Sequence, residues 1–87
     1  MKKIRIDFSE ELSSLAGNSF GRSTYDSFVE PYINSKKIIV EFPEQIERVA
    51  IGFVQGFIYK LGPKEFKRKI EISGNPNFVK QFLERLE

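Results

Sequence analysis

The sequence contains no cysteine and no histidine. Without cysteine there are no disulfides and no thiolate chemistry, and without histidine the chain lacks the commonest general base and the commonest metal ligand. Only carboxylates and carbonyls remain as metal ligands, which disfavours a transition-metal site. These absences, together with the presence of only two Asp residues, predict that the chain is not an enzyme and carries no cofactor.

A bilayer-spanning run and a secretory signal are also missing. The first residues, MKKIRIDF, alternate between charged and apolar side chains and include no long apolar stretch. The longest apolar run, Val49–Leu61, is too short to span a bilayer and is interrupted by glycines. We therefore expect a cytoplasmic protein with no membrane partner.

The length of 87 residues, 40% of them hydrophobic, predicts one folded domain, residues 1–87, around one modest core. Nine Phe and three Tyr supply the large buried area that a small domain needs. The net charge of +2 is too low to indicate a nucleic-acid partner by itself. The carboxylate pairs Glu10–Glu11 and Glu44–Glu47 lie in polar segments, where we expect solvated surface rather than an acid and a base.

Three segments alternate between apolar and charged residues, as strands with one covered face do. Their apolar rows are Ile4, Ile6 and Phe8, then Ile38, Val40 and Phe42, then Phe66, Ile70 and Ile72. The opposite rows are charged apart from Ile39, and Arg68 interrupts the third apolar row. The open face therefore has no aromatic side chains on which nucleic-acid bases could stack, and we do not expect nucleic acid as a partner.

Three helices are predicted between and after these strands. Pro31 lies inside the first, which therefore starts late or kinks. The second is Val49–Leu61, which ends at Gly62. The third begins with Asn75 as the N-cap and Pro76 as its first residue. The apolar stripes of the first and third helices are Tyr25, Phe28, Val29, Tyr32 and Ile33, and Phe78, Val79, Phe82, Leu83 and Leu86.

The predicted order is βαβαβα, with a short extra strand over Leu12–Ala16 as an open option. Parallel strands joined by right-handed crossovers carry both connecting helices on the same face, which agrees with the one-faced strand pattern. The sequence thus predicts a small α/β domain with a mostly parallel sheet and helices mainly on one face. The open edges of such a sheet leave a homodimer as an option.

Residues 17–24 read as a loop with binding potential. Free amides before a helix bind anions, and an arginine would add a bidentate contact, although the spacing is not that of a P-loop. Such a loop would hold a phosphate or nucleotide through Gly17, Asn18, Ser19, Gly21 and Arg22. The other interpretation is turn chemistry, with Ser23 or Thr24 as an N-cap. Further along, Gly52 and Gly56 predict close packing of the second helix on the sheet.

The segment IIVEF at residues 38–42 reads as a buried strand, FVQGFIYKL at residues 53–61 as a buried helix, and KIEISGNPNFVKQFLERL as a closing strand and helix. This arrangement resembles the STAS domain, the fold of bacterial anti-sigma-factor antagonists and of sulfate-transporter tails. A small bacterial STAS-like family is more similar still. Its members carry a Gly-Arg near the first helix and a Phe, a Lys-Leu and a basic run later. Gly21-Arg22, Phe53, Phe57, Lys60-Leu61 and residues 65–72 are similar to these features.

The resemblance implies a regulatory domain that docks a protein partner, such as a histidine-kinase-type ATPase or another anti-sigma-like regulator. In antagonists, a Ser before the buried helix is phosphorylated, and the added charge breaks the complex. Here Ala50 and Ile51 stand at that turn and cannot accept phosphate, which leaves Ser19, Ser23 and Thr24 as alternative phosphosites. The docking residues we expect are Glu47, Arg48 and Ile51 at the loop–helix junction, with Arg22 and Ser23 from the neighbouring segment.

Overall fold

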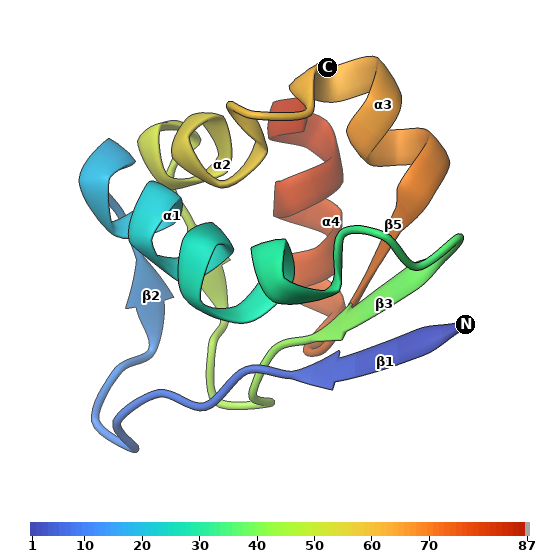
Figure 1. Cartoon of the computed structure of the whole chain (residues 1–87). Coiled ribbons are helices and arrows are strands. Elements are labelled where there is room, and N and C mark those ends of the chain that lie inside the picture. The colour runs from blue at the N-terminus through green and yellow to red at the C-terminus, as the bar shows by residue number, and fades with distance from the viewer. Residues whose placement is uncertain (87) are drawn as a thin grey trace.

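In the computed structural model, which describes residues 1–86, a parallel sheet lies beneath a layer of helices (Figure 1). Its strands are β1 (Lys2–Arg5), β3 (Ile38–Glu41) and β5 (Ile70–Ser73), in the order β1-β3-β5. A second, two-stranded parallel sheet pairs β2 (Ser14–Leu15) with β4 (Arg48–Val49). The predicted small α/β class with a mostly parallel sheet is confirmed, and β2 lies inside the segment proposed as an extra strand.

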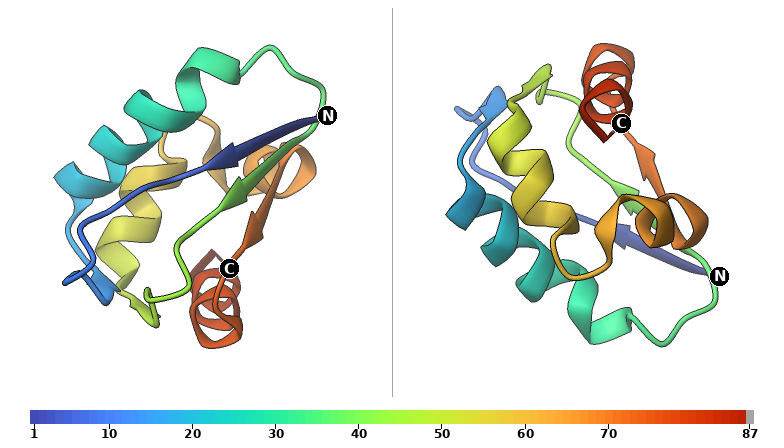
Figure 2. Two further views of the ribbon diagram at one scale, coloured as in Figure 1. Left: turned by 90° about the horizontal axis from the view of Figure 1, so that it is seen from below. Right: turned by 90° about the horizontal axis from the view of Figure 1, so that it is seen from above.

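The helices all cover one face of the three-stranded sheet. In Figure 2 the strands lie nearest the viewer from below, and the helices lie nearest from above. The helical segments are α1 (Asn18–Thr24), a π-helical turn (Tyr25–Val29), a 3-10 turn (Glu30–Tyr32), α2 (Ile51–Ile58), α3 (Gly62–Lys69) and α4 (Pro76–Leu86). Within residues 1–86, no helix has the length and apolar composition needed to cross a bilayer.

The strand register confirms the predicted one-faced pattern. Ile4, Val40 and Ile72 are aligned across the three strands and are buried. On the opposite face, the Glu41 carboxylate lies 2.7 Å from Arg5 Nε and 3.6 Å from Lys3 Nζ. The open face is therefore held by ion pairs between β1 and β3, while the apolar rows face the helices.

The first helix starts earlier than its apolar stripe suggests. It begins at Asn18, changes to the π-helical turn at Tyr25 and tightens to a 3-10 turn around Pro31. Pro31 has no N–H to donate to the carbonyl four residues earlier, so regular α-helix does not continue through it. Of the predicted stripe, Tyr25 and Val29 are fully buried, whereas Tyr32 is 41% exposed.

The third predicted strand is wrong over residues 66–69, which belong to α3. Pro63 lies in the first turn of this helix, where its missing N–H breaks no hydrogen bond, and Glu65 pairs with Arg68 one turn later. Phe66 is the only residue of α3 that is buried, so α3 shows no helical stripe in the sequence. Gly62, predicted to end the preceding helix, has a φ of 79° and does mark the break between α2 and α3.

The core is a cluster of aromatic rings between α2, α4 and the sheet. The predicted buried helix is confirmed as α2, in which Phe53, Val54, Phe57 and Ile58 are all buried. It is shorter than the predicted Val49–Leu61, because Val49 belongs to β4 and residues 59–61 form a turn. The rings of Phe53 and Phe57 join those of Phe42, Phe66, Phe78 and Phe82, with neighbouring centroids 4.6–6.3 Å apart. The predicted start of α4 is also confirmed, because Asn75 Oδ1 accepts a hydrogen bond of 2.9 Å from the Asn77 N–H.

Candidate functional site

The junction that leads into α2 is held by hydrogen bonds to two other segments, β2 with the residue before it and α4. The Glu47 N–H donates to the Ser13 carbonyl over 2.8 Å, and the Ala50 N–H donates to the Leu15 carbonyl over 2.8 Å. Between them, the Val49 N–H donates to Oε1 of Gln81 on α4 over 3.1 Å. These bonds clamp residues 47–50 along β2 on one side and against α4 on the other. Side chains that leave this junction therefore have a fixed backbone beneath them.

The exposed side chains of the junction form one surface. Val49 and Phe53 point into the core and anchor the backbone. Glu47, Arg48 and Ile51 point outward, and the Ile51 side chain is 48% exposed. An apolar group flanked by a carboxylate and a guanidinium, all on a fixed backbone, suits protein recognition, because little entropy is lost on binding. Three of the five predicted docking residues are thus exposed within one five-residue segment, and their role in docking stays a prediction.

The other two, Arg22 and Ser23, lie elsewhere on the protein. The Arg22 guanidinium lies 4.2 Å from the centre of the Tyr59 ring, beyond the last residue of α2. Ile51 is the first residue of the same eight-residue helix, so about 12 Å of helix separates the two sites. Arg22 and Ser23 therefore do not extend the junction surface, and the sequence could not show this because α1 and α2 run side by side.

Residues 17–24 are not the predicted loop, because Asn18–Thr24 form α1. The two glycines that suggested a loop have other roles. Gly17 starts the helix with a φ of 97°. At Gly21 a Cβ atom would lie 2.3 Å from the Phe53 carbonyl oxygen. Gly21 thus permits close contact between two helices, and its N–H donates to the Gly17 carbonyl over 3.1 Å. The predicted loop conformation is wrong over residues 18–24, whereas ligand binding by this segment stays a prediction.

Gly56 makes the matching contact from α2. A Cβ atom there would lie 2.1 Å from the Asn18 carbonyl oxygen, so the close contact of α2 at this glycine is with α1 and not, as predicted, with the sheet.

The predicted N-cap roles of Ser23 and Thr24 are also wrong. Thr24 is the last residue of α1, and its hydroxyl donates to the Phe20 carbonyl over 2.7 Å. Because Thr24 is also only 3% exposed, it is closed to a kinase, whereas Ser19 and Ser23 are exposed.

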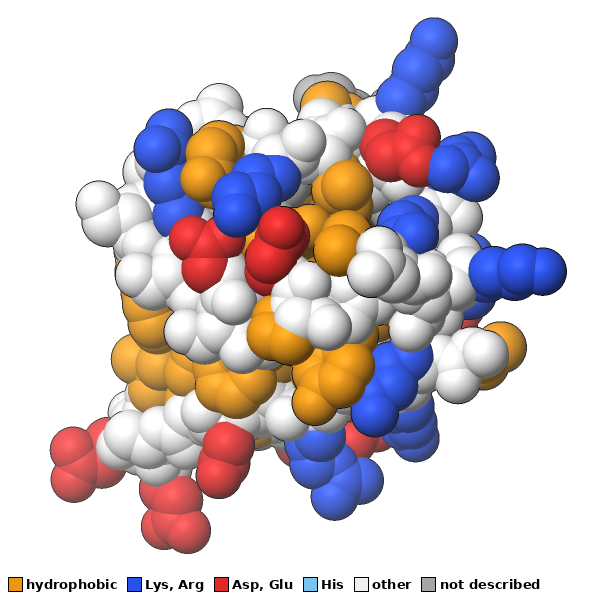
Figure 3. Space-filling view, in the orientation of Figure 1, with side chains coloured by type: hydrophobic (Ala, Val, Ile, Leu, Met, Phe, Trp, Pro, Cys, Tyr) orange, Lys and Arg blue, Asp and Glu red, His pale blue; other side chains and the backbone are white. Residues whose placement is uncertain are grey.

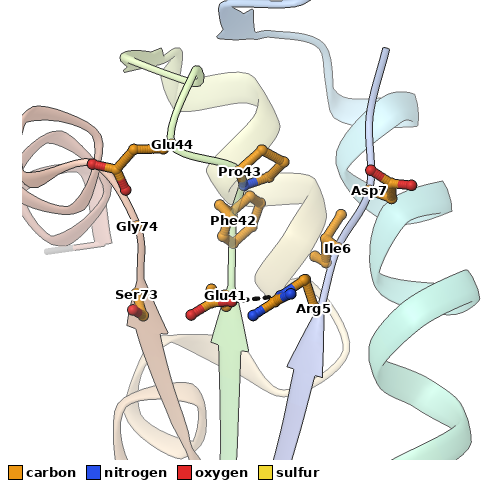
Figure 4. Close-up of a pocket in the computed structure, with 9 residues that line it drawn as sticks. All are labelled: Arg5, Ile6, Asp7, Glu41, Phe42, Pro43, Glu44, Ser73 and Gly74. Carbon is orange, nitrogen blue, oxygen red and sulfur yellow. Dashed lines mark hydrogen bonds and ion pairs between the residues drawn. The ribbon is translucent and has the colours of Figure 1, made fainter. Parts of the chain in front are cut away.

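A hollow that sequence reasoning missed lies where the strands of the large sheet end (Figure 4). It has a volume of about 370 Å³ and contains the Arg5–Glu41 ion pair. The hydrogen bond from Arg5 holds the pKa of the Glu41 carboxyl below its ordinary value. Small ligands of α/β proteins often bind beyond the carboxyl ends of parallel strands, and this rule was the signal that could have located the hollow.

The chemistry of this hollow gives no catalytic arrangement. Figure 4 shows Arg5 and Glu41 turned toward each other, while the carboxylates of Asp7 and Glu44 point to opposite sides. Two carboxylates that share a task as acid and base must face one bound substrate. Among residues 1–86, no cluster of three or more metal-ligating side chains exists. The loops around the hollow are instead tied together, with Gln45 donating to the Ser9 carbonyl over 2.8 Å and Asn75 to the Glu44 carbonyl over 3.2 Å.

A third polar cluster lies over the π-helical turn. Lys60 Nζ is 3.1 Å from Asp26 Oδ1 and 3.7 Å from Glu30 Oε1, and these contacts raise the pKa of Lys60. Tyr25 lies beneath, and burial raises the pKa of its hydroxyl well above the ordinary value. The Tyr25 oxygen has no hydrogen-bond partner of good geometry, although the nearby Glu30 carboxylate adds to the shift. The cluster therefore joins the residues that follow α2 to the π-helical and 3-10 turns, and its one ammonium is outnumbered by two carboxylates.

Comparisons with known proteins find no match, either to protein-family models, to curated proteins or to solved structures.

Proposed function

We propose that the chain is a non-catalytic, STAS-like interaction domain of a bacterial regulator, and that it docks a protein partner in the cytoplasm through the start of α2. The order of elements supports the proposal. A buried strand, β3, leads through a short connection to a helix buried on most sides, α2, and a further strand and amphipathic helix follow. This is the order that the STAS resemblance implies, and fold alone does not assign function.

The observation that carries the proposal is the exposed Ile51 at the clamped junction. An isoleucine that is 48% exposed gains about 0.7–1.5 kcal/mol when a partner buries the rest of it, half of the value for a fully exposed side chain. Glu47 and Arg48, exposed beside it, set the orientation of the partner through charge. By family analogy, the partner is a histidine-kinase-type ATPase or another anti-sigma-like regulator.

Regulation at this surface differs from that of phosphorylated antagonists. Ala50 and Ile51 have no hydroxyl, so phosphate cannot be added at the turn. Ser19 and Ser23 are the exposed hydroxyls of α1, and they lie on another element. Partner binding at the junction is therefore constitutive unless one of these serines takes over.

The test is a pull-down with the wild-type chain as bait, followed by the variants Ile51→Glu and Arg48→Glu. Each variant should lose the partner, because a charge replaces the apolar anchor or inverts the orienting charge. Tyr32→Glu is the matched control, since Tyr32 is 41% exposed and lies beside β1, away from α2. If a partner binds both junction variants as well as it binds the control, the docking surface is wrong.

A further inference from the structure

The positive charges of the chain gather at one end of the sheet. Because β1, β3 and β5 are parallel, their amino ends meet at the same edge, and basic residues precede or begin each strand. Figure 3 shows Lys and Arg side chains gathered on the right of the molecule, where Figure 1 marks the N-terminus. Seven of the 14 Lys and Arg residues lie in these strand starts: Lys2, Lys3, Lys36, Lys37, Lys67, Arg68 and Lys69.

An apolar groove opens at this basic end. It has a volume of about 400 Å³ and is bounded by α3, the edge strand β5 and α4. Val79 and Leu83 line it from the apolar stripe of α4, and Leu83 is 49% exposed. Lys37 and Lys67 line it as well, with Glu71 as the one carboxylate among the lining residues. We call this surface the basic groove.

The opposite end of the sheet is acidic and carries a partly exposed apolar patch. Beyond β1 the chain turns at Ser9–Leu12, where Glu10 and Glu11 are exposed. Next to this turn, the Phe8 and Phe20 rings stack edge to face with centroids 5.7 Å apart, and Phe20 is 37% exposed. In Figure 3 hydrophobic side chains lie directly above acidic ones at the lower left. The surface formed by Phe8, Glu10, Glu11, Leu12 and Phe20 is the acidic knob.

The two surfaces match in both charge and polarity. The groove is an apolar hollow lined also by Lys37 and Lys67, and the knob is a partly exposed apolar patch beside the exposed Glu10 and Glu11. Among residues 1–86, no ion pair holds Lys36, Lys37 or Lys69, and none holds Glu10 or Glu11. These charges are free to act between molecules. Because the surfaces lie at opposite ends of the strands, they cannot meet within one molecule.

We propose that the acidic knob of one copy docks in the basic groove of the next. Burial of aromatic side chains supplies the attraction, and the opposite charges fix the register and speed the encounter. A contact between two different surfaces of the same chain is head-to-tail, so it builds rings or open rows of molecules rather than a two-fold dimer. The junction before α2 takes no part in this contact, so a failure of this proposal and a failure of the proposed partner docking can be told apart.

Sedimentation velocity at about 20 mM and about 1 M salt tests the proposal, because these conditions move the Debye length from about 20 Å to 3 Å. At low salt the weight-average mass should rise with concentration above the 10.1 kDa of one chain. At high salt the weight-average mass should fall at least several-fold, toward the mass of one chain. A chain that stays monomeric at low salt up to millimolar concentration overturns the proposal, and the basic end would then suit an acidic protein or a nucleic acid instead.

A charge exchange makes the test specific. Lys36→Glu with Lys37→Glu gives an acidic groove, and Glu10→Lys with Glu11→Lys gives a basic knob. Each double variant alone should remain monomeric, because its groove and knob now carry like charges. Mixed in equal amounts, the two variants should associate again, since each groove meets a knob of opposite charge. If either variant alone associates like the wild type, or if the mixture stays monomeric, the pairing of these two surfaces is wrong.

Two further variants separate charge from position. Lys64→Glu with Arg85→Glu changes the net charge by the same amount outside both surfaces, and it should associate like the wild type. Leu83→Ser removes the exposed apolar side chain from the groove and should weaken association about tenfold or more. Circular dichroism of each variant checks that the fold is kept, which is expected because all these side chains except that of Lys37 are exposed.

Discussion

At the scale of single residues, Tyr25 makes two opposing contributions to the stability of the folded state. Its ring is fully buried and packs edge to face on Phe57, with centroids 5.9 Å apart. Its hydroxyl, however, is buried with no hydrogen-bond partner of good geometry. An unpaired buried hydroxyl destabilises the folded state, since it has given up water without replacement. The sequence predicted the burial from the apolar stripe, but neither the unpaired oxygen nor the π-helical turn in which Tyr25 lies could be read from it.

Replacing Tyr25 with Phe should therefore raise the free energy of unfolding, by about 1 kcal/mol. The ring packing remains, and the unpaired oxygen is removed. Urea denaturation of wild type and variant measures the change, with Tyr32→Phe, an exposed position, as a control that should not differ. A loss of stability in Tyr25→Phe would show that the hydroxyl does bond to Glu30.

The same residue should control stability in alkali. The pKa of Tyr25 is raised in the folded state, whereas in the unfolded chain it lies near 10. The unfolded state therefore releases this proton first, so the stability contributed by the group is complete below about pH 10 and is lost as the pH rises further. In Tyr25→Phe, the part of the alkaline loss in unfolding free energy that comes from this hydroxyl should be absent. Unfolding free energies of the wild type and of Tyr25→Phe, each measured at about pH 8 and pH 11, isolate the contribution of Tyr25, because the other titrating groups are common to both proteins.

At the scale of elements, the decisive feature is the contact between α1 and α2. Gly21 and Gly56 let the two backbones approach so closely that a single Cβ atom would overlap a carbonyl oxygen. The sequence predicted α2 and the close packing at Gly56, but it assigned the partner surface to the sheet. The glycines of residues 17–24 read as loop signals, since nothing local distinguishes a glycine that breaks a helix from one that admits a neighbour.

Gly56→Ala should lower the free energy of unfolding by at least about 2 kcal/mol, because the added methyl group forces the helices apart. Gly52→Ala is a matched control on the same helix. A Cβ atom there would meet its nearest neighbour at 3.7 Å, an ordinary contact, and alanine favours helix over glycine by about 0.5–1 kcal/mol. The control should therefore be as stable as the wild type or more stable. Equal effects of the two substitutions in thermal denaturation would contradict the close crossing.

At the scale of the whole molecule, the sheet could be predicted because two independent rules agree. Period-two patterns gave the buried faces of β1 and β3, and the right-handed crossover rule placed the helices over them. The small β2–β4 sheet could not be predicted as a pair, because each strand has two residues and no period can show in so short a segment.

The candidate surface was partly predictable, since Glu47, Arg48 and Ile51 lie close together in sequence. Its separation from Arg22 depends on how α1 and α2 pack, which no local pattern encodes.

One aromatic network, with Phe57 at its centre, joins several elements of the fold. The Phe57 ring lies within 6.0 Å, centroid to centroid, of five others: those of Tyr25, Phe42, Phe53, Phe66 and Phe82. These rings come from the π-helical turn, the strand β3 and its end, α2, α3 and α4. A small domain has few other contacts that join every layer. Stability should therefore be more sensitive to this residue than to any exposed ring.

Phe57→Ala should cost about 3–5 kcal/mol, the range for a buried phenylalanine. A domain of this size is stable by only about 4–13 kcal/mol in total, at the usual 0.05–0.15 kcal/mol per residue. At about 4–8 °C per kcal/mol, the melting temperature should fall by at least about 12 °C. Phe20→Ala is the control, because Phe20 belongs to the edge of the network and is 37% exposed, so less area returns to water. Calorimetry of both variants decides the matter: a similar loss from each would mean that the layers are joined by general burial and that Phe57 has no central role.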